Sequence, residues 1–312
     1  MLVHKLVSIS NNSELVMKSQ SILVIGHWMV DRILQVPKGI LLKNPLPTQH
    51  LHVPILTQPG GSGYHFSLAA KKAGFRPVYA VICVGRDTPG RILTDTAYKS
   101  EVFVISHKSK IGTGEAFLIY DTNGRRASFG TRQANLELPD FTLQVLKKLR
   151  PKNVFVAGHV LEDRTRLEKV VEFLSVLKDY GCFTVFDVVP HDIQKKISSK
   201  TRTAIANSVS GIIGTRNALI PFLSDDSMND QSDLDIVNDL LENFEWVCLH
   251  PDNDKLIIGE RNGRKTRTHQ IATHYKDSKI KAGALDKSVA RELYNHAIRR
   301  WRLQINNGQG VE

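Results

Sequence analysis

The sequence predicts a doubly wound α/β protein with a mostly parallel sheet, and two observations carry this prediction. Short β-branched runs occur at 21–26, 78–85, 153–158, 182–189, 210–215 and 245–250. Between them, apolar residues recur at helical spacing in 62–74, 87–99, 165–180 and 233–243. Strands that alternate with helices in this way are typical of a parallel sheet with crossover helices.

Two segments do not follow this alternation, and both have the pattern of β-hairpins. They cover about 32–58 and 115–130, and the second contains the turn pair Asn123-Gly124 between extended arms. We expect them to form a small sheet over one edge of the core, which would act as a lid on a pocket. Residues 21–312 are therefore predicted to form a single domain, preceded by an N-terminal extension of residues 1–20.

Composition indicates a globular protein, since 41% of the 312 residues are hydrophobic and 23% are charged. Cys83, Cys182 and Cys248 each lie in an apolar run. Reduced core thiols in a cytoplasmic protein are the simplest interpretation. The longest apolar run near the N-terminus covers only 22–26, which is too short to span a membrane and argues against a signal peptide.

The net charge of +11 comes from 42 Lys and Arg against 31 Asp and Glu. Such an excess suits anionic ligands such as nucleotides and sugar phosphates, or nucleic acid. The basic residues are scattered and lack interleaved aromatic residues, which argues against single-strand binding. A solvated basic surface is the simpler interpretation.

Two glycine-rich turns precede predicted helices. In QPGGSGYHFSLAAKKAGF, Gly60 and Gly61 allow backbone N–H groups to approach a ligand at a helix N-terminus. In VGRDTPGRIL, Asp87 is placed to cap the next helix. Each motif alone is common at the start of a helix, so neither identifies a function by itself.

Taken together and in this order, the motifs resemble those of the PfkB or ribokinase-like carbohydrate kinases, from about Ser21 to Tyr294. ILVIGHWMVDRIL resembles the family's first strand and its substrate-binding acid, here Asp31. GGSGYHFSLAAKKAGF followed by VGRDTPG is similar to the first family signature, and TGEAFLIYDTNGRRASF to the lid hairpin. GCFTVFDVVP resembles the strand that ends in an Asp, here Asp187. The starts MVDRI and VPIL…PGG look most like heptose-phosphate kinase domains.

The resemblance implies transfer of the ATP γ-phosphoryl group to a hydroxyl of a sugar, sugar phosphate or nucleoside, with Mg²⁺ as the metal ion. The acceptor would lie between sheet and lid, bound by Asp31, Gly60 and Gly61. His65 stands where the family has an Asn, and it is counted with Asp87 among the residues on the acceptor side. A homodimer that forms through the lid is a further expectation.

The stretch KDSKIKAGALDKSVARELY resembles the family's phosphate loop and catalytic helix. With three extra residues, GALD aligns with Gly-Ala-Gly-Asp, so Asp286 becomes the base and Gly283 and Ala284 belong to the phosphate loop. Aligned without a gap, Gly283 takes the position of the base and the protein has none. Lys279 and Lys281 are either substitutes for lost backbone dipoles at the phosphate or solvated loop lysines.

Other positions at the nucleotide end depart from the family pattern. Thr215 and Ala218 stand where the family has an Asn-x-x-Glu that organises Mg²⁺, and this loses a carboxylate ligand. The run from Cys248 to His250 replaces a Thr-x-Gly turn under the nucleotide. The alternative is therefore a catalytically inactive ribokinase-fold protein that binds a sugar-like ligand or a protein partner. A nucleic-acid-associated module is the third hypothesis.

Two further single histidines and one pair have no assigned role in this resemblance. His159 follows a predicted strand end, where pockets form in open α/β sheets, and it is either a ligand contact or a loop residue. His191 comes just after Asp187 and could contact substrate. The pair His269 and His274 is too isolated to predict a metal site.

Overall fold

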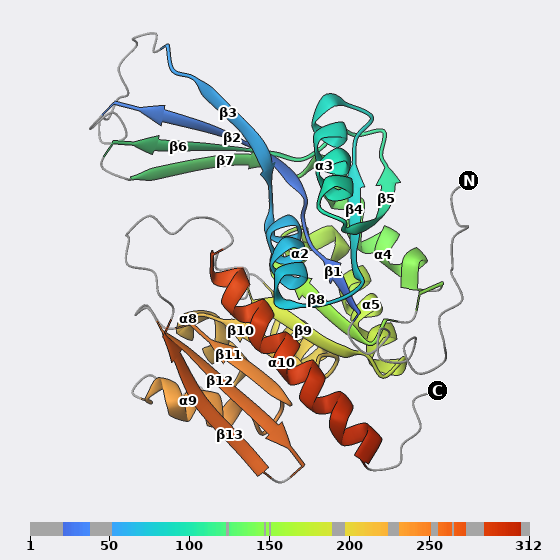
Figure 1. Cartoon of the computed structure of the whole chain (residues 1–312), viewed down its shortest axis with the longest axis vertical. Coiled ribbons are helices and arrows are strands. Elements are labelled where there is room, and N and C mark those ends of the chain that lie inside the picture. Colours follow the sequence, from blue (N-terminus) through green and yellow to red (C-terminus); the bar gives the residue numbers. More distant parts are fainter. Residues whose placement is uncertain are drawn as a thin grey trace.

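The structure, a computed structural model, describes residues 21–37, 52–122, 125–146, 148–149, 151–188, 197–223, 231–250, 255–263, 265–272 and 284–306 (Figure 1). The strands are β1 (Ile22–Ile25), β2 (Met29–Val36), β3 (Ile55–Gly60), β4 (Val78–Val84), β5 (Phe103–Lys108), β6 (Glu115–Asp121), β7 (Arg126–Thr131), β8 (Asn153–Ala157), β9 (Phe183–Val188), β10 (Gly211–Gly214), β11 (Trp246–Leu249), β12 (Lys255–Asn262) and β13 (Lys265–Ala272). The α-helices are α2 (Ser62–Ala73), α3 (Thr88–Lys99), α4 (Leu138–Leu146), α5 (Leu167–Asp179), α7 (Ser199–Ala206), α8 (Arg216–Leu219), α9 (Asp233–Leu240) and α10 (Ala284–Asn306). Short 3₁₀ turns are η2 (Gln133–Glu137), η3 (Gly158–Leu161), η4 (Arg164–Arg166) and η5 (Ile220–Phe222).

The main sheet has nine strands in the order β13-β12-β11-β10-β9-β8-β1-β4-β5. The seven neighbouring strands β11, β10, β9, β8, β1, β4 and β5 pair in parallel. Strands β12 and β13 extend the sheet beyond β11 as an antiparallel edge. The six runs predicted as strands are consecutive neighbours in the sheet, from β11 to β4. The predicted doubly wound, mostly parallel fold class is confirmed.

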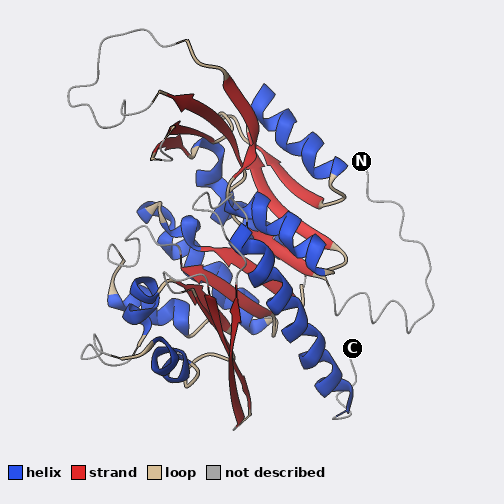
Figure 2. Ribbon diagram, turned by 60° about the vertical axis from the view of Figure 1, so that its left-hand side comes forward, coloured by secondary structure: helices blue, strands red, loops and turns tan. Residues whose placement is uncertain are grey.

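The two faces of this sheet carry separate apolar cores, because successive side chains of a strand point to opposite faces. In β1, Leu23 and Ile25 belong to the cluster under α4, α5, α7 and α9, whereas Ile22 and Val24 belong to the cluster under α2, α3 and α10. All four β1 side chains are fully buried. Helices therefore cover the sheet on both sides, as Figure 2 shows.

A second sheet of four strands, the lid sheet, has the order β3-β2-β6-β7 and projects from one end of the core (Figure 1). Its strands come from the two segments predicted as hairpins. Strands β6 and β7 pair antiparallel up to Tyr120 and Arg126, which flank the predicted Asn123-Gly124 turn. The turn itself lies outside the described residues.

Several elements were not predicted from the sequence, among them β5, α4, α7, α8 and the β12–β13 hairpin. Strand β13 reads KTRTHQIA, in which only Ile271 and Ala272 are aliphatic. It pairs with β12 over eight residue pairs, from Lys255 with Ala272 to Asn262 with Lys265. An edge strand takes its stability from this backbone ladder and needs no apolar periodicity of its own, so the pattern could not reveal it.

Helix α10 is the longest, with 23 residues, and it packs across α2. Tyr294 meets the ring of Phe75 edge-on at 5.1 Å, and a Cβ on Gly74 would lie 2.8 Å from the Tyr294 ring. At the other end of α10, Arg299 pairs with Glu260 of β12. No described helix, α10 included, is both long and apolar enough to cross a membrane.

The Asp87 carboxylate joins helix α3 to the base of the lid sheet. One oxygen caps the helix by accepting from the Gly90 N–H at 2.8 Å, and both oxygens accept from Thr113, at 2.6 Å from its hydroxyl and 2.7 Å from its N–H. Burial works to raise the pKa of Asp87, but these hydrogen bonds outweigh it and hold the pKa below its usual value. The carboxylate is used within the fold, and a contact of Asp87 with an acceptor stays a prediction.

Replacing Asp87 with Ala should lower the free energy of unfolding by about 1–3 kcal/mol, because it removes a helix cap and leaves two Thr113 donors without their acceptor. Chemical denaturation monitored by circular dichroism measures this. The matched control is Asp95→Ala, an exposed position on the same helix, which should change stability by less than about 0.5 kcal/mol. Equal losses in both variants would contradict the assigned role of Asp87.

Candidate functional site

The residues with the most unusual environments gather at the carboxyl edge of the parallel strands, below the lid sheet. His27 follows β1, His159 follows β8, and Asp187 lies one residue before the end of β9. Asp286 is in the first turn of α10, and Asp31 reaches down from β2 of the lid sheet. In open α/β sheets ligands bind at this edge, because loops and helix N-termini converge there.

Asp31 is held against the glycine pair. Its carboxylate is almost fully buried, with 6% of the residue exposed, and a Cβ on Gly60 would lie 2.1 Å from its Oδ2 atom. Burial raises the pKa of Asp31 to about 6, although the positive charge of Arg126 on β7 partly offsets this effect. Only glycine at position 60 leaves room for the acid, so the two residues act as one structural unit.

Gly61 and Gly63 let the start of α2 cross directly over the end of β1. Gly61 has φ = +91°, and a Cβ there would lie 2.4 Å from the His27 carbonyl oxygen. The Gly63 N–H donates to that same carbonyl oxygen at 3.0 Å. A Cβ on Gly63 would lie 2.5 Å from the Gly26 oxygen, so backbone meets backbone at this crossing. The first turn of α2 is thereby placed beside Asp31 and His27.

Asp286 and Asp187 lie close enough at this edge of the sheet for their charges to interact. Burial and, as the smaller cause, the charge of the nearby Asp187 carboxylate raise the pKa of Asp286 to about 7. Burial also raises the pKa of Asp187, to about 6, and His159 lowers it in part. Two neighbouring carboxyls that are both hard to ionise are suited to proton transfer or to cation binding near neutral pH.

A cluster of His27, His159, Glu162 and Arg132 lies next to the two carboxyls. The two imidazole rings stack with their centroids 6.0 Å apart, and His159 Nδ1 lies 2.7 Å from Glu162 Oε1. Arg132 pairs with the other Glu162 oxygen. Burial, together with the charges of His159 and Arg132, lowers the pKa of His27 to about 3, although the charge of Glu162 works to raise it. His27 is therefore neutral. Sequence reasoning selected only His159 of these four, because no local motif links them.

His65 lines a hollow of about 240 Å³ between β3, α2 and the start of α10. Its Nε2 atom has no hydrogen-bond partner among the described residues, and burial lowers the pKa of the ring. The remaining lining residues are Gln58, Pro59, Tyr64, Leu68, Ala69, Lys72 and Lys287. A neutral imidazole, an amide, a phenol and two ammonium groups offer donors to an anionic or hydroxyl-rich molecule.

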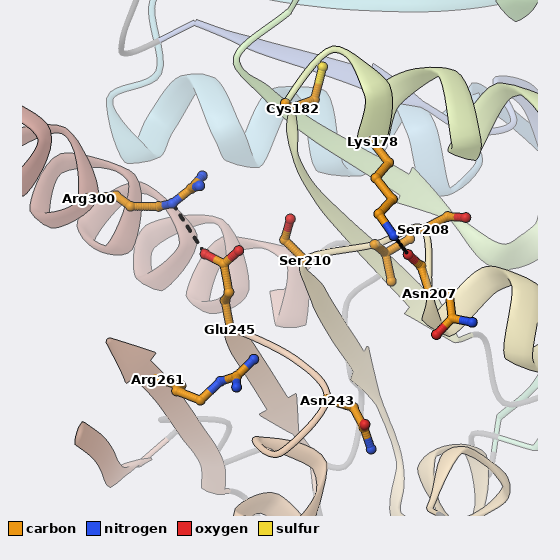
Figure 3. A pocket seen from close by; sticks show the side chains of 11 residues that line it. Lys178, Cys182, Asn207, Ser208, Ser210, Asn243, Glu245, Arg261 and Arg300 are labelled. Atoms are coloured by element: carbon orange, nitrogen blue, oxygen red, sulfur yellow. Dashed lines mark hydrogen bonds and ion pairs between the residues drawn. The ribbon is translucent and has the colours of Figure 1, made fainter. Parts of the chain in front are cut away.

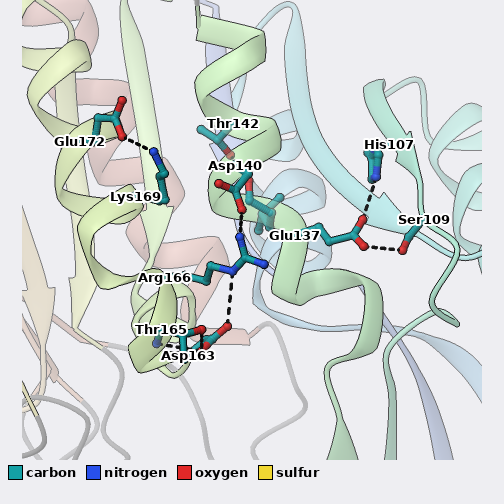
Figure 4. A network of polar contacts seen from close by, with 11 residues as sticks. His107, Ser109, Glu137, Asp140, Thr142, Asp163, Thr165, Arg166, Lys169 and Glu172 are labelled. Carbon is teal, nitrogen blue, oxygen red and sulfur yellow. Dashed lines mark hydrogen bonds and ion pairs between the residues drawn. The ribbon is translucent and has the colours of Figure 1, made fainter.

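A polar network behind the site holds η2 and α4, which carry the Arg132 side of the cluster (Figure 4). Glu137 accepts from the Ser109 hydroxyl at 2.9 Å, and its other oxygen lies 2.7 Å from His107 Nε2. Arg166 of η4 pairs with Asp140 at the start of α4. These contacts tie the loop after the lid sheet to both the core and the β5 edge.

The structure places the nucleotide-end residues as follows. Cys248 is fully buried inside β11, where burial and the charges of Asp187 and Glu292 raise the pKa of its thiol. His250 directly follows β11 and is half-buried, and its N–H donates to the Gly214 oxygen at 3.0 Å. Ala218 is buried in α8. Cofactor contacts at Cys248 and His250 stay predictions.

The phosphate-loop residues are described only in part. Asp286 lies in the first turn of α10, and Ala284 is the first residue of that helix. Gly283, Lys279 and Lys281, together with His191 and His274, lie outside the described residues. Their predicted roles are therefore untested.

The Asp286 environment predicts a pH-dependent stability. The unfolded carboxyl has a pKa near 4, so between about pH 4 and pH 7 only the folded protein keeps the proton. The contribution of this proton to the free energy of unfolding is largest below the pKa of the unfolded carboxyl. This contribution is lost as the pH rises through 7. Asp286→Asn removes this dependence, so the variant should gain stability over the natural protein as the pH rises, by about 1–2 kcal/mol once partial screening by solvent is allowed for.

Urea denaturation at several pH values between 4 and 8 checks this. The control is Asp179→Asn, the same substitution at an exposed position in the last turn of α5, which should shift stability equally at every pH. Parallel pH profiles for both variants would contradict the environment assigned to Asp286.

Comparisons with known proteins agree with this architecture. No protein-family model matches the sequence, and no curated protein matches it either. Among solved structures, ribokinase from Giardia lamblia matches with a TM-score of 0.65 and 17% identity over 88% of this chain and 84% of that one. Adenosine kinase from Anopheles gambiae, in complex with P1,P4-di(adenosine-5) tetraphosphate, matches with a TM-score of 0.68 and 15% identity over 89% and 92%. Ribokinase from Thermotoga maritima matches with a TM-score of 0.64 and 18% identity over 88% and 86%. The chain therefore has the PfkB or ribokinase-like fold.

Proposed function

We propose that the protein is a phosphotransferase that moves the γ-phosphoryl group of ATP to a hydroxyl of a sugar, sugar phosphate or nucleoside. The observation that supports this best is the buried position of Asp286, in the first turn of α10, close to Asp187 near the end of β9. A carboxyl with a pKa of about 7 is poised to accept a hydroxyl proton at neutral pH. Phosphoryl transfer requires mainly a base of this kind and the correct positioning of the two substrates.

On the acceptor side, Asp31 would accept hydrogen bonds from the acceptor hydroxyls, and Gly60 and Gly61 would allow the ligand to approach the backbone. Similar structures include kinases named for ribose, adenosine and acarbose. Lys72 and Lys287 line the hollow beside His65 and favour an acceptor that itself bears a phosphate. A heptose phosphate fits this chemistry.

The residues that would hold ATP and Mg²⁺ can be tested only in part. Asp187 and Asp286 are two neighbouring carboxyls that a bound cation would stabilise in the charged form, so they fit Mg²⁺. Bound Mg²⁺ would neutralise charge that develops on the phosphoryl oxygens. Within the described residues, no group of three or more His, Cys, Asp and Glu side chains is arranged around a metal position. The loop expected to hold the phosphates lies outside the described residues.

The second candidate is a non-catalytic protein of the same fold that binds a sugar-like ligand. It is favoured by the nucleotide end, where a buried alanine, Ala218, stands at the position expected for a metal-organising carboxylate, and where Cys248 has no exposed surface. The acceptor side keeps Asp31 and the glycine pair. The two candidate functions differ in whether the protein binds and consumes ATP.

A phosphotransfer assay separates them. ATP consumption should depend on one member of a panel of sugars, sugar phosphates and nucleosides, and Asp286→Asn should lower kcat by about 10²- to 10⁴-fold because it removes the base. Asp179→Asn, with the same change at an exposed position, should leave kcat unchanged.

A folded protein that neither binds ATP in calorimetry nor consumes it with any acceptor would overturn the kinase proposal. Thermal stabilisation by a sugar or sugar phosphate in the absence of ATP would then support the binding protein. Full phosphotransfer by the Asp286→Asn variant would show that another group is the base.

We also propose that the outer face of the lid sheet binds a second copy of this chain. Phe117 of β6 and Phe129 of β7 are paired neighbours with 43% and 64% of their surface exposed. Ile55 of β3, 56% exposed, extends the same apolar face through its pairing with Leu34. The charge of Arg32 at this face is already paired with Glu115 at 2.7 Å, so a copy would not have to desolvate a lone charge.

Light scattering during gel filtration should show a dimer that Phe129→Ser converts to a monomer, because the substitution removes the most exposed of the three apolar side chains of this face. Tyr98→Ser is the control, since Tyr98 is 86% exposed and belongs to the last turn of α3, outside the lid sheet. A monomeric natural protein, or a dimer that survives Phe129→Ser, would contradict the proposal.

A further inference from the structure

A second polar hollow lies at the opposite end of the main sheet, where strands β9, β10 and β11 begin (Figure 3). Its volume is about 270 Å³. The side chains and backbone around it come from the end of α5, the turns before β10 and β11, strand β12 and the second half of α10. Its lining residues are Lys178, Gly181, Cys182, Asn207, Ser208, Val209, Ser210, Asn243, Glu245, Arg261 and Arg300.

The hollow carries an excess of positive charge. Three of its residues, Lys178, Arg261 and Arg300, are cations, and Glu245 is the one acid among the lining residues. Arg300 lies 3.4 Å from the Glu245 carboxylate, whereas Lys178 donates to the neutral Asn207 carbonyl oxygen at 2.7 Å. Within the described part of the chain, no acid pairs with the Arg261 guanidinium. Among the described residues, Lys178 and Arg261 therefore have no acidic partner.

The cations are held in place by the fold. The Arg300 guanidinium lies over the Phe183 ring, 4.7 Å from its centroid, which fixes it by a cation–π contact. The Arg261 N–H donates to the Glu245 carbonyl oxygen at 2.8 Å, so the two residues that flank the hollow are joined through backbone. In Figure 3 the Glu245 side chain lies between those of Arg300 and Arg261. Both arginines are half-buried, which reduces screening of their charge by water.

Neutral donors complete the lining. Ser210 and Asn243 add a hydroxyl and an amide, and Asn207 adds a second amide. The Ser208 hydroxyl already donates to the Ala204 carbonyl oxygen at 2.7 Å. Guanidinium, ammonium, amide and hydroxyl donors around one hollow suit an oxyanion with three or more acceptor oxygens, such as a phosphate group.

We propose that this hollow binds a small phosphate-bearing molecule. Its volume is slightly below the range of pockets for drug-sized ligands, so it would hold a phosphate on a short carbon skeleton. The ligand would displace Glu245 from Arg300, because a dianion competes with the carboxylate for the guanidinium. The proposal does not depend on the proposed kinase activity, since the hollow shares no residue with the site at the other edge.

Helix α10 connects the hollow with the candidate functional site. Asp286 lies in its first turn and Arg300 fourteen residues later, about 21 Å along the axis at 1.5 Å per residue. A phosphate that binds Arg300 would therefore add a contact to the helix that carries Asp286. A ligand in the second hollow would therefore influence the position of α10.

Calorimetric titration with inorganic phosphate at constant ionic strength tests the proposal. The natural protein should show saturable binding at concentrations up to about 10 mM, and Arg261→Gln should weaken it about tenfold because a charged hydrogen-bond donor is lost. Glu245→Gln should instead tighten binding about threefold or more, because the competing carboxylate is gone. The control is Arg267→Gln on β13, an exposed arginine outside the hollow, which should leave the affinity unchanged.

The opposite signs of the two lining variants distinguish this site from general attraction of anions to a basic protein. Equal affinity in the natural protein, Arg261→Gln and Glu245→Gln would overturn the proposal, as would the absence of saturable binding. Phosphate affinity that changes in Asp286→Asn but not in Arg261→Gln would place the anion at the other edge of the sheet and would also overturn it. Circular dichroism confirms that each variant is folded.

Discussion

The close crossing of helix α2 over the end of β1 is the constraint on which the candidate site depends. The Gly63 N–H donates to the His27 oxygen at 3.0 Å, and a Cβ on Gly63 would lie 2.5 Å from the Gly26 oxygen. No side chain fits between the two backbones, so glycine is required on physical grounds alone. Because of this contact, Gly60 and Gly61 lie beside Asp31, and the lid sheet is anchored above the carboxyl edge of the parallel strands.

Burial at that edge determines the chemistry of the ionisable groups. Asp31, Asp187 and Asp286 come from three separate elements, and burial raises the pKa of each into the range from about 6 to 7. The same burial keeps His27 neutral. The carboxyls at this edge can therefore bind a ligand or accept a proton. At the opposite edge the excess is positive, and helix α10 reaches both places.

Much of the fold was predictable from local sequence pattern, and the failures have a common cause. Central strands such as β4 and β8 are buried on both faces and read as continuous apolar runs, which makes them visible in a single sequence. Strand β13 is held by its ladder with β12, and α7 contributes only Ile205 to the buried core. Elements whose stability comes from neighbours, with little apolar periodicity of their own, cannot be recognised from local pattern.

The sequence by itself determined the central strands and their crossover helices, the glycine-rich start of α2 and the placement of Asp286 at a helix start, because these depend on residues close together in the chain. Only the tertiary structure placed Asp187 near Asp286, stacked His27 on His159, and gathered Arg261 and Arg300 around Glu245. These groups are separated by tens of residues to more than a hundred, and no local periodicity records such pairings. Their pKa values and charge balance arise only when burial brings them together, so the chemistry of both sites is a property of the folded chain.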